Sequence, residues 1–360
     1  MNEILHIEQK LKSYLLSVVQ QGASDLHLVV GRHPTIRVDG KLMPLLEEEV
    51  LTPQKTKELS KILMTENYEK EMLQEGQVNF AYNFENKARF RTSVYFQQGN
   101  LSIAMRLVQS KIRTLEELDV NTALYDFTKY SQGLVLVTGP VGHGKSTTLA
   151  AIMDYINHTQ DKHILTIEDP IEYVYQQDRC IINQREVGED SKDFASALRG
   201  IFREDVNVLL IGEMRDLDTI ATAMTAAETG HLIFATLHTN NSAQTVDRIV
   251  DVFPAHQQNQ IRSQLANVLL GVVSQRLIPR IGGGRVAAME IMLKNHAVAN
   301  LIRENRSYQI DSVIETSLKE GMISLDRSLS QLVREGIISI DDAFAYTSNR
   351  EYLKTIIKNK

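Results

Sequence analysis

The sequence has 360 residues, is 43% hydrophobic and 23% charged, and carries a formal net charge of −6. This length predicts two or three compact domains, and the composition excludes a disordered or fibrous chain. The acidic charge balance argues against nucleic acid as a main partner. The lone cysteine, Cys180, excludes an internal disulfide and a cysteine-cluster metal site, and it favours a reducing compartment, the cytoplasm.

The start of the chain lacks a basic region followed by an apolar run, so we expect no secretory signal. The nearest candidate for a membrane span, 265–273, is much shorter than the ~18 to 20 residues that a spanning helix needs. We therefore expect any association with a membrane to be peripheral.

An amphipathic helix is predicted at the start of the chain. Ile4, Leu11, Leu15 and Val18 recur at helical spacing, and Gly22 follows where a C-terminal cap belongs.

Strands are predicted next, over 25–30 and 35–45, with a hairpin turn at Asp39-Gly40. Thr52 and Pro53 suit the N-cap and first residue of another helix.

Apolar and polar residues then alternate over three further segments, which predicts an antiparallel sheet with one buried face. The alternating residues are Val78, Phe80, Tyr82 and Phe84, then Ala88, Phe90 and Thr92, and then Leu101, Ile103, Met105 and Leu107. We expect residues 1–110 to form a small α+β domain and 111–132 to be a connector with a short helix.

A different pattern begins at Gly133, where short continuous apolar runs alternate with helical patterns. The runs are 134–137, 164–167, 208–211 and 232–235. They predict βαβ units and a parallel sheet covered on both faces, with one more strand at 285–293. We expect this α/β domain to span 133–294.

Four helical patterns follow the last predicted strand, at 297–303, 311–318, 325–334 and 341–346. They predict a C-terminal helical region over 295–360.

The segment that follows the predicted strand 134–137 matches the P-loop pattern G-x-x-x-x-G-K-[ST] and precedes a predicted helix. It reads Gly139-Pro140-Val141-Gly142-His143-Gly144-Lys145-Ser146, and Thr147 follows it. Backbone N–H groups and the helix N-terminus would hold the phosphates of ATP. Lys145 would neutralise phosphate charge, and Ser146 would bind Mg²⁺.

Three acidic residues at the ends of predicted strands are candidates to complete the site. Glu213 ends an apolar strand, as the metal-side acid of such enzymes does, but Gly212 precedes it where many have Asp, so Glu213 is expected to act through a metal-bound water. Glu168 and Glu172 follow another strand. We interpret Glu172 as the general base and Glu168 as support for the metal or the loop. The alternative is that Glu172 caps the turn after Pro170.

Two histidines, His231 and His238, flank the strand 232–236. A histidine by itself is more often packed or solvated than catalytic, but the carboxyl edge of a parallel sheet is where ligands bind. We expect His238 to sense the γ-phosphate or to hold the attacking water, and His231 to lie with the nucleotide-binding residues.

Taken together, these blocks resemble the PilT branch of the secretion and pilus ATPase superfamily. Residues 166–173 (TIEDPIEY) resemble its Asp box, 212–217 (GEMRDL) its Walker B block and 230–240 its His box, and 21–28 (QGASDLHL) resemble the opening of its PAS-like domain. The resemblance implies a RecA-like P-loop NTPase core with an N-terminal PAS-like α+β domain and a C-terminal helical region.

The resemblance also implies a homohexameric ATPase that powers type IV pilus retraction. Arg89, Arg91 and Arg106 are the candidates to reach ATP on a neighbouring subunit, and alternation places Arg89 and Arg91 on the face away from the core. A solvated strand face is the alternative for each. The implied partners are a pilus platform protein of the inner membrane, at whose cytoplasmic face the ring would sit, and a second retraction ATPase.

Two departures from the family pattern stand out. His143 occupies a position where the family usually has Ser, and Val298 and Ala299 depart from the C-terminal motif at 297–304. The chain lacks the extra N-terminal domain and four-cysteine insert of assembly ATPases, which favours retraction. The alternatives are a PilU-like accessory retraction ATPase, a DNA-translocating or conjugation-type ATPase, and a nucleotide-dependent scaffold with negligible turnover.

Overall fold

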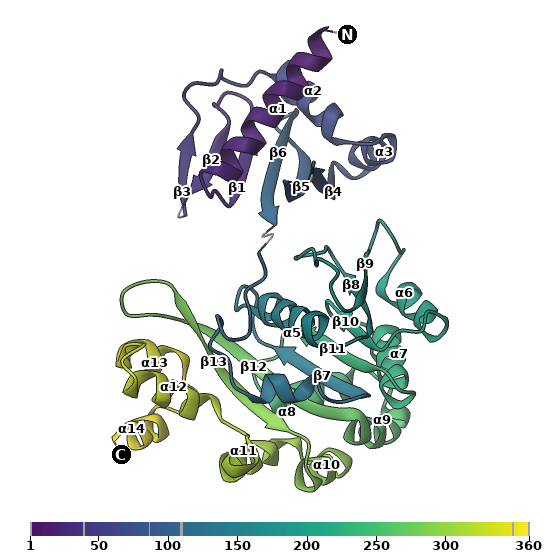
Figure 1. The fold of residues 1–360 in the computed structure, drawn as a ribbon, viewed down its shortest axis with the longest axis vertical. Coiled ribbons are helices and arrows are strands. Elements are labelled where there is room, and N and C mark those ends of the chain that lie inside the picture. The colour runs from purple at the N-terminus through teal and green to yellow at the C-terminus, as the bar shows by residue number, and fades with distance from the viewer. Residues whose placement is uncertain (1, 39, 86, 109–110, 348, 359–360) are drawn as a thin grey trace. The chain divides into compact units, whose positions relative to one another are not determined.

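The computed structural model describes residues 2–38, 40–85, 87–108, 111–347 and 349–358. Asp39 of the predicted hairpin turn and Gln109, near the predicted domain boundary, lie outside the described residues. The chain divides into two compact units, Met1–Lys111 and Ile112–Lys360 (Figure 1). Each unit has its own sheet and its own hydrophobic core.

The first unit is an antiparallel sheet of six strands, in the order β3-β2-β1-β6-β5-β4, with three helices. Its strands are β1 (Asp25–Leu28), β2 (Thr35–Val38), β3 (Lys41–Pro44), β4 (Gln77–Phe84), β5 (Ala88–Gln97) and β6 (Asn100–Val108). Its helices are α1 (Asn2–Gln20), α2 (Pro53–Leu63) and α3 (Glu66–Glu75).

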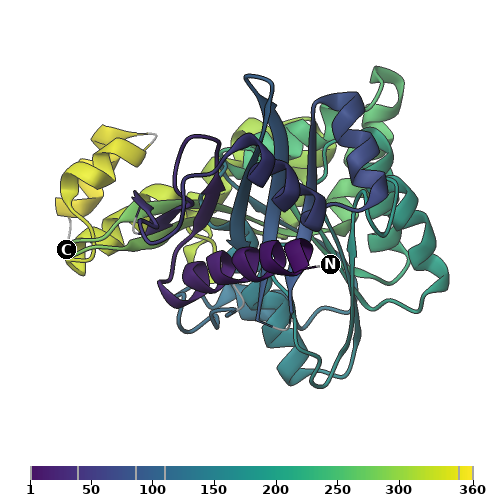
Figure 2. The ribbon, with the colours of Figure 1, turned by 90° about the horizontal axis from the view of Figure 1, so that it is seen from above.

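Helix α1 lies across the sheet of this unit and buries its apolar stripe against it (Figure 2). Leu11, Leu15 and Val18 are each at most 1% exposed. Thr52 caps α2 as predicted, accepting a hydrogen bond from the N–H of Lys55. Sequence reasoning missed α3, because its ten residues bury little apolar surface.

The second unit is built on a seven-stranded sheet in the order β13-β12-β7-β11-β10-β8-β9, parallel except for β13. Its strands are β7 (Gly133–Thr138), β8 (His163–Glu168), β9 (Ile181–Glu186), β10 (Val208–Ile211), β11 (Leu232–Leu237), β12 (Leu269–Pro279) and β13 (Arg285–Leu293). The segment 265–273 divides between the end of a helix and β12, a strand that sequence reasoning missed because its apolar run continues the helix.

Helices cover both faces of this sheet. The helices of the second unit are α4 (Ala123–Phe127), α5 (Lys145–Thr159), α6 (Phe194–Gly200), α7 (Leu217–Glu228), α8 (Ser242–Asp251), α9 (Ala255–Val268), α10 (His296–Arg303), α11 (Ile310–Thr316), α12 (Leu325–Arg334), α13 (Ile340–Tyr346) and α14 (Arg350–Lys358), of which α4 to α11 cover the two faces. Three 3₁₀ helices are η1 (Ile201–Arg203), η2 (Ser307–Gln309) and η3 (Leu318–Glu320).

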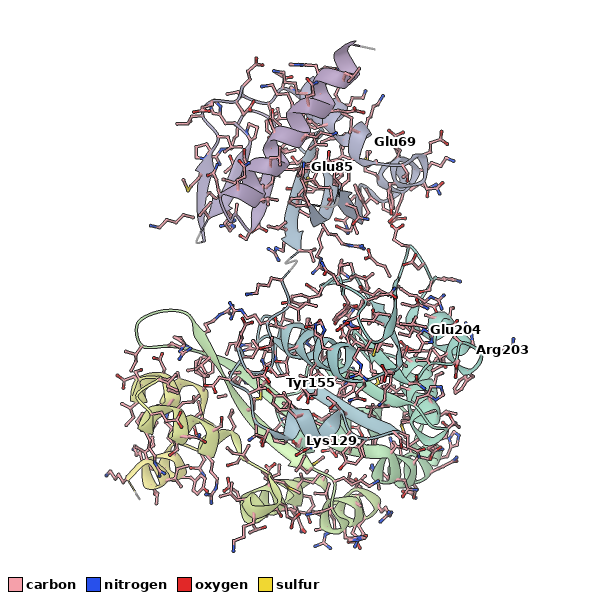
Figure 3. The ribbon with its side chains drawn as sticks, in the orientation of Figure 1. Glu69, Glu85, Lys129, Tyr155, Arg203 and Glu204 are labelled. Atoms are coloured by element: carbon pink, nitrogen blue, oxygen red, sulfur yellow. The ribbon has the colours of Figure 1, made fainter. Side chains whose placement is uncertain are left out.

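The central strands send alternate side chains into two cores, one on each face. Leu134 and Leu136 pack with α6 to α9, whereas Val135 and Val137 pack with α4 and α5. This two-sided burial explains why the strands are continuous apolar runs. Charged side chains such as Arg203 and Glu204 instead point outward (Figure 3).

The last three helices form a separate small core on the far part of the β12–β13 hairpin. Leu329, Ala343 and Leu353 pack there with Ile278 and Ala288. No helix within the described ranges is both long enough and apolar enough to span a bilayer. The fold observed is the α/β fold predicted for the chain, and its last three helices pack against the antiparallel edge of the sheet.

Candidate active site

The P-loop connects the carboxyl end of β7 to the first turn of α5. Gly142 and Gly144 have positive φ angles of 79° and 84°, which only glycine adopts without strain, and they curl the backbone into a cradle. Gly144 is also the N-cap of α5. Ser146 and Thr147 therefore lie in the first turn of this helix, where the helix dipole favours an anion.

Lys145 is buried in this cradle. Its Nζ donates to the carbonyl oxygens of Gly139 (2.7 Å) and Pro140 (3.0 Å). Burial lowers its pKa, and Arg276 adds to this, while Glu213 acts in the opposite direction. The ammonium group is thus desolvated, and an anionic phosphate is the partner that such a cation favours.

Glu213 follows β10, the strand next to β11. Arg215 Nε lies 2.5 Å and His238 Nε2 lies 3.2 Å from its Oε1 atom. Burial raises the pKa of Glu213, but Arg215 and His238 outweigh it, so the pKa falls below the usual range. The carboxylate is therefore held ionised, as a metal-side acid must be.

Gly212, which precedes Glu213, packs closely against the end of β8. A Cβ atom at this position would lie 3.2 Å from Glu168 Cα and 3.3 Å from the Ile167 carbonyl oxygen, because β10 and β8 run side by side. A side chain here would require the neighbouring backbone to shift by a few tenths of an ångström.

His238, at the carboxyl end of β11, joins the P-loop lysine to the acid. Its Nδ1 lies 3.3 Å from Lys145 Nζ, and its Nε2 faces Glu213. Because an ammonium group can only donate, Nδ1 accepts and Nε2 carries the hydrogen. Lys145, Glu213 and His238, all predicted site residues, therefore meet in one cluster.

His231 does not join this cluster within the second unit. It lies at the amino end of β11, and a six-residue strand spans about 20 Å. Its Nδ1 lies 3.0 Å from the Ala226 carbonyl oxygen, and its ring contacts Phe202 edge-on.

Glu168 and Glu172 meet in the loop after β8. The Glu172 N–H donates to Glu168 Oε2 (3.2 Å), and the Thr166 hydroxyl donates to Glu168 Oε1 (2.8 Å). Burial raises the pKa of Glu168 to about 7. Glu168 is thus a buried support for the loop, and Glu172 is the more exposed carboxylate of the two.

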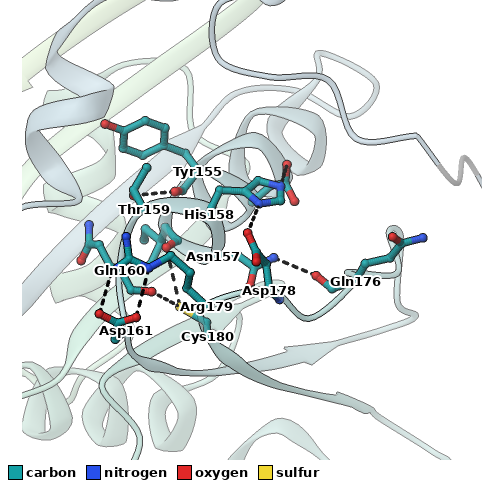
Figure 4. A network of polar contacts seen from close by, with 12 residues as sticks. Tyr155, Asn157, His158, Thr159, Gln160, Asp161, Gln176, Asp178, Arg179 and Cys180 are labelled. Carbon is teal, nitrogen blue, oxygen red and sulfur yellow. Dashed lines mark hydrogen bonds and ion pairs between the residues drawn. The ribbon is translucent and has the colours of Figure 1, made fainter.

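Helix α5 holds this acidic loop as well as the P-loop. The Thr147 hydroxyl lies 2.8 Å from the Tyr173 hydroxyl. At the other end of α5, the buried Asn157 side chain donates to the Gln176 carbonyl oxygen (2.8 Å) and accepts from the Asp178 N–H (3.2 Å), within the polar network of Figure 4. The two loops are therefore fixed to one rigid helix.

Sequence reasoning missed two residues of β12 that contact this site. Gln275 donates from Nε2 to the His143 carbonyl oxygen (2.8 Å) and accepts from the Thr148 hydroxyl (2.8 Å). Arg276 donates from Nη2 to Asn240 Oδ1 (2.9 Å). Three consecutive polar residues after a buried apolar run, 274–276, were the available signal.

A cavity of ≈ 350 Å³ opens beside this site. It lies between the loop after β11, the β12–β13 hairpin and the C-terminal helices, and it is lined by Asn240, Arg276, Glu290, Asp311 and Tyr346 among others. No P-loop residue lines it. This cavity is therefore distinct from the P-loop cradle.

The predicted arginines lie on the sheet of the first unit. Arg91 and Arg106 are directly opposite each other on β5 and β6, and Arg106 is opposite Asp25, which is opposite Arg37. Arg106 Nε donates to Asp25 Oδ1 (2.9 Å). These four side chains form a row across four neighbouring strands with a formal charge of about +2, since three cations face one acid. Arg89 lies two residues before Arg91 on β5.

Comparison with known proteins bears on this geometry. The family model described as "Type II/IV secretion system protein" matches residues 2–283. The chain is 47% identical over 327 residues to the Type IV pilus retractation ATPase PilT of Pseudomonas aeruginosa, covering 90% of this chain and 94% of that protein. It is 36% identical to the Type IV pilus ATPase PilU of the same organism, covering 97% and 91%.

A crystal structure of the pilus retraction motor PilT with bound ADP superimposes with a TM-score of 0.90. It is 42% identical, and the match covers 96% of this chain and 98% of that one.

Proposed function

Because the chain belongs to the type II/IV secretion system protein family and is a pilus retraction ATPase of its PilT branch, we propose that it works as a homohexameric ring whose ATP cycle returns pilins to the membrane. The observation that carries the hydrolytic part is the meeting of Lys145, His238 and Glu213 at one sheet edge. We place the ring at the cytoplasmic face of the inner membrane, bound to the pilus platform protein. The higher identity to PilT than to PilU favours a principal motor over an accessory one, with a PilU-like ATPase as a partner.

ATP would enter as its Mg²⁺ complex. Mg²⁺ keeps several waters and is held by few protein oxygens together with phosphates. The Ser146 hydroxyl and the ionised Glu213 supply oxygen ligands of that kind, the second through a water. The ion would neutralise charge that develops on the phosphates.

The two glutamates of the loop after β8 have different roles in this proposal. Glu172, the more exposed carboxylate, orients and deprotonates the attacking water. Glu168 holds the Glu172 backbone and stays buried. His238 fixes the distance between Lys145 and Glu213, so that the cation and the metal-side acid are arranged before the phosphate arrives.

The arginine row of the first unit supports catalysis between subunits. Arg91 lies directly opposite Arg106, so this part of the sheet carries a net positive charge that suits an anionic partner. We propose that this face, with Arg89, contacts the phosphates of ATP bound to a neighbouring subunit. Asp25 orients Arg106 for that contact through its hydrogen bond to Nε.

Mixing two inactive variants tests the ring and its shared site together. Lys145→Ala lacks the P-loop cation and Arg91→Ala lacks the donated one, so each protein alone should lose at least about 100-fold in turnover. A mixture should recover part of the activity, because some sites then combine an intact P-loop with an intact arginine. A mixture as inactive as its components would contradict a site shared between subunits.

The proposed role in pilus retraction is tested in cells. Pili of a strain that carries Glu172→Gln should extend but not retract, while the purified variant still binds ADP. Normal retraction in that strain, or hydrolysis by purified wild-type protein no faster than by Glu172→Gln, would refute the motor.

A further inference from the structure

His143, the residue that departs from the family P-loop, makes a hydrogen bond that ties this loop to the sheet. Its Nδ1 accepts from the backbone N–H of Leu277 at 2.9 Å. Since a backbone N–H can only donate, the ring presents a lone pair at Nδ1 and is neutral with its hydrogen at Nε2.

The Leu277 N–H needs such a partner because β12 is longer than its neighbour β7. The two strands pair from Leu134 opposite Leu269 to Thr138 opposite Ser274, and β12 continues to Pro279. Past Ser274, this side of β12 is an edge whose backbone groups must be satisfied by other groups.

The P-loop lies along this edge at close range. A Cβ atom on Gly139 would come within 2.4 Å of the Gln275 carbonyl oxygen, and one on Gly144 within 2.8 Å of Gln275 Nε2. Gln275 also donates to the His143 carbonyl oxygen. His143 is therefore fixed to β12 through both its backbone and its side chain.

The same imidazole contacts the C-terminal helices. The ring of Tyr346, the last residue of α13, lies edge-on to it with centroids 6.4 Å apart and an interplanar angle of 73°. Tyr346 also lines the cavity beside the site, together with Arg276.

We propose that His143 is a positioning residue that latches the P-loop to β12 and, through Tyr346, makes phosphate binding depend on the placement of helix α13. This inference rests on the proposed nucleotide site and adds to it a route by which the C-terminal helices act on the P-loop. The latch opens when Nδ1 is protonated, because a second N–H then faces the N–H of Leu277.

The groups around the imidazole oppose that protonation. Arg276 of β12, Lys145 of α5 and Arg285 of β13 are cations near the ring, and Tyr346 is the contact from α13. Burial first, and these three charges second, lower the pKa of His143 below its usual 6.5. The latch is therefore closed at neutral pH and opens only in acid.

Binding of a fluorescent ADP analogue to the full chain, measured from pH 5 to 8, tests the latch. His143→Asn places an amide oxygen where Nδ1 lies but does not titrate, whereas His143→Ala removes the acceptor. At pH 7.5 we expect Kd to rise roughly ten-fold in the Ala variant and to stay within about three-fold of wild type in the Asn variant. Toward the acid end of this range, wild type should lose affinity that the Asn variant keeps.

Equal affinity of wild type and the Ala variant, or the same pH profile for wild type and the Asn variant, would overturn the proposal. If wild type itself bound no ADP analogue, and so matched Lys145→Ala, the proposed nucleotide site would fail instead.

The contact with α13 is tested by a double-mutant cycle. Tyr346→Ala should weaken binding of the analogue about three-fold in the wild-type background but have no effect in the His143→Ala background. Tyr346→Phe, which keeps the ring, is the matched control and should bind as wild type does. Equal effects of Tyr346→Ala in both backgrounds would contradict coupling through His143.

Discussion

The Nδ1 atom of His238 lies 3.3 Å from the Nζ atom of Lys145, although 93 positions separate them in the chain. The parallel pairing of β7 and β11 brings them together, because the P-loop and the residue after β11 both follow the carboxyl ends of neighbouring strands. Through its other nitrogen His238 reaches Glu213. One imidazole thus separates a desolvated cation from an ionised carboxylate.

Removing this imidazole should let the two charges collapse onto each other. We expect His238→Ala to lower ATPase turnover by about 10- to 100-fold and to change the Kd for ADP much less, because a lysine drawn to Glu213 is displaced from the transferring phosphate. Steady-state hydrolysis and ADP titration measure the two effects. His163→Ala, at the amino end of β8, is the control and should stay within about two-fold of wild type. Unchanged turnover of His238→Ala would remove the bridging role.

The buried carboxyl of Glu168 should make stability depend on pH. Its pKa is raised by burial to about 7 in the folded protein, against 4.5 as its ordinary value. Between these values the folded state binds more protons than the unfolded state, so the free energy of unfolding falls as the pH rises from about 4.5 to 7.

Replacing the Glu168 carboxyl group by a neutral amide should remove this dependence of stability on pH. Glu168→Gln should be more stable than wild type at pH 8, by about 1 to 3 kcal/mol, and the difference should vanish toward pH 4.5. Thermal denaturation at a series of pH values measures it. A difference that is constant over this range would show that Glu168 is not the titrating group.

Three glycines with ordinary φ angles should respond to alanine in a graded order. At Gly200 a Cβ atom would meet the flexible ends of Glu204 and Arg185, so this change should be neutral or stabilising. At Gly212 the contact is with the backbone of Glu168 at 3.2 Å, and a loss of about 1 kcal/mol is expected.

At Gly271 the Cβ atom would lie 2.5 Å from the Phe127 ring and 2.7 Å from the Met292 carbonyl oxygen, which should cost about 3 kcal/mol or prevent folding. Melting temperatures of the three variants give the order, and a Gly212→Ala variant as stable as Gly200→Ala would show that β8 and β10 yield without cost.

Asn157 should be one of the most sensitive polar residues of α5. It is fully buried and bonds the loop that carries Glu172. Asn157→Ala removes two part-buried hydrogen bonds, to the Gln176 carbonyl oxygen and from the Asp178 N–H, so a loss of about 1 to 3 kcal/mol is expected, seen as a lower melting temperature.

Thr159→Ala, an exposed change two residues further on, is the control for Asn157→Ala and should alter stability by less than about 0.5 kcal/mol. Similar effects of the two changes would mean that the loop is not held through Asn157.

The sequence by itself determined the class of fold, the P-loop and the order of the sequence motifs along the chain. Each of these depends on residues that are close together in the sequence. Continuous apolar runs mark strands buried on both faces, and the spacing from Gly139 to Ser146 specifies a loop that binds phosphate. Such signals need only neighbours in the chain.

Tertiary structure alone decided which residues share the site. The sequence groups both His231 and His238 with the nucleotide site, yet only His238 lies beside Lys145 and Glu213. Gln275 and Leu277 contact the P-loop only because β12 extends beyond the end of β7. Arg91 lies opposite Arg106 only because of the register between β5 and β6. These relationships depend on strand order, length and register, which arise from contacts between distant segments and leave no local pattern.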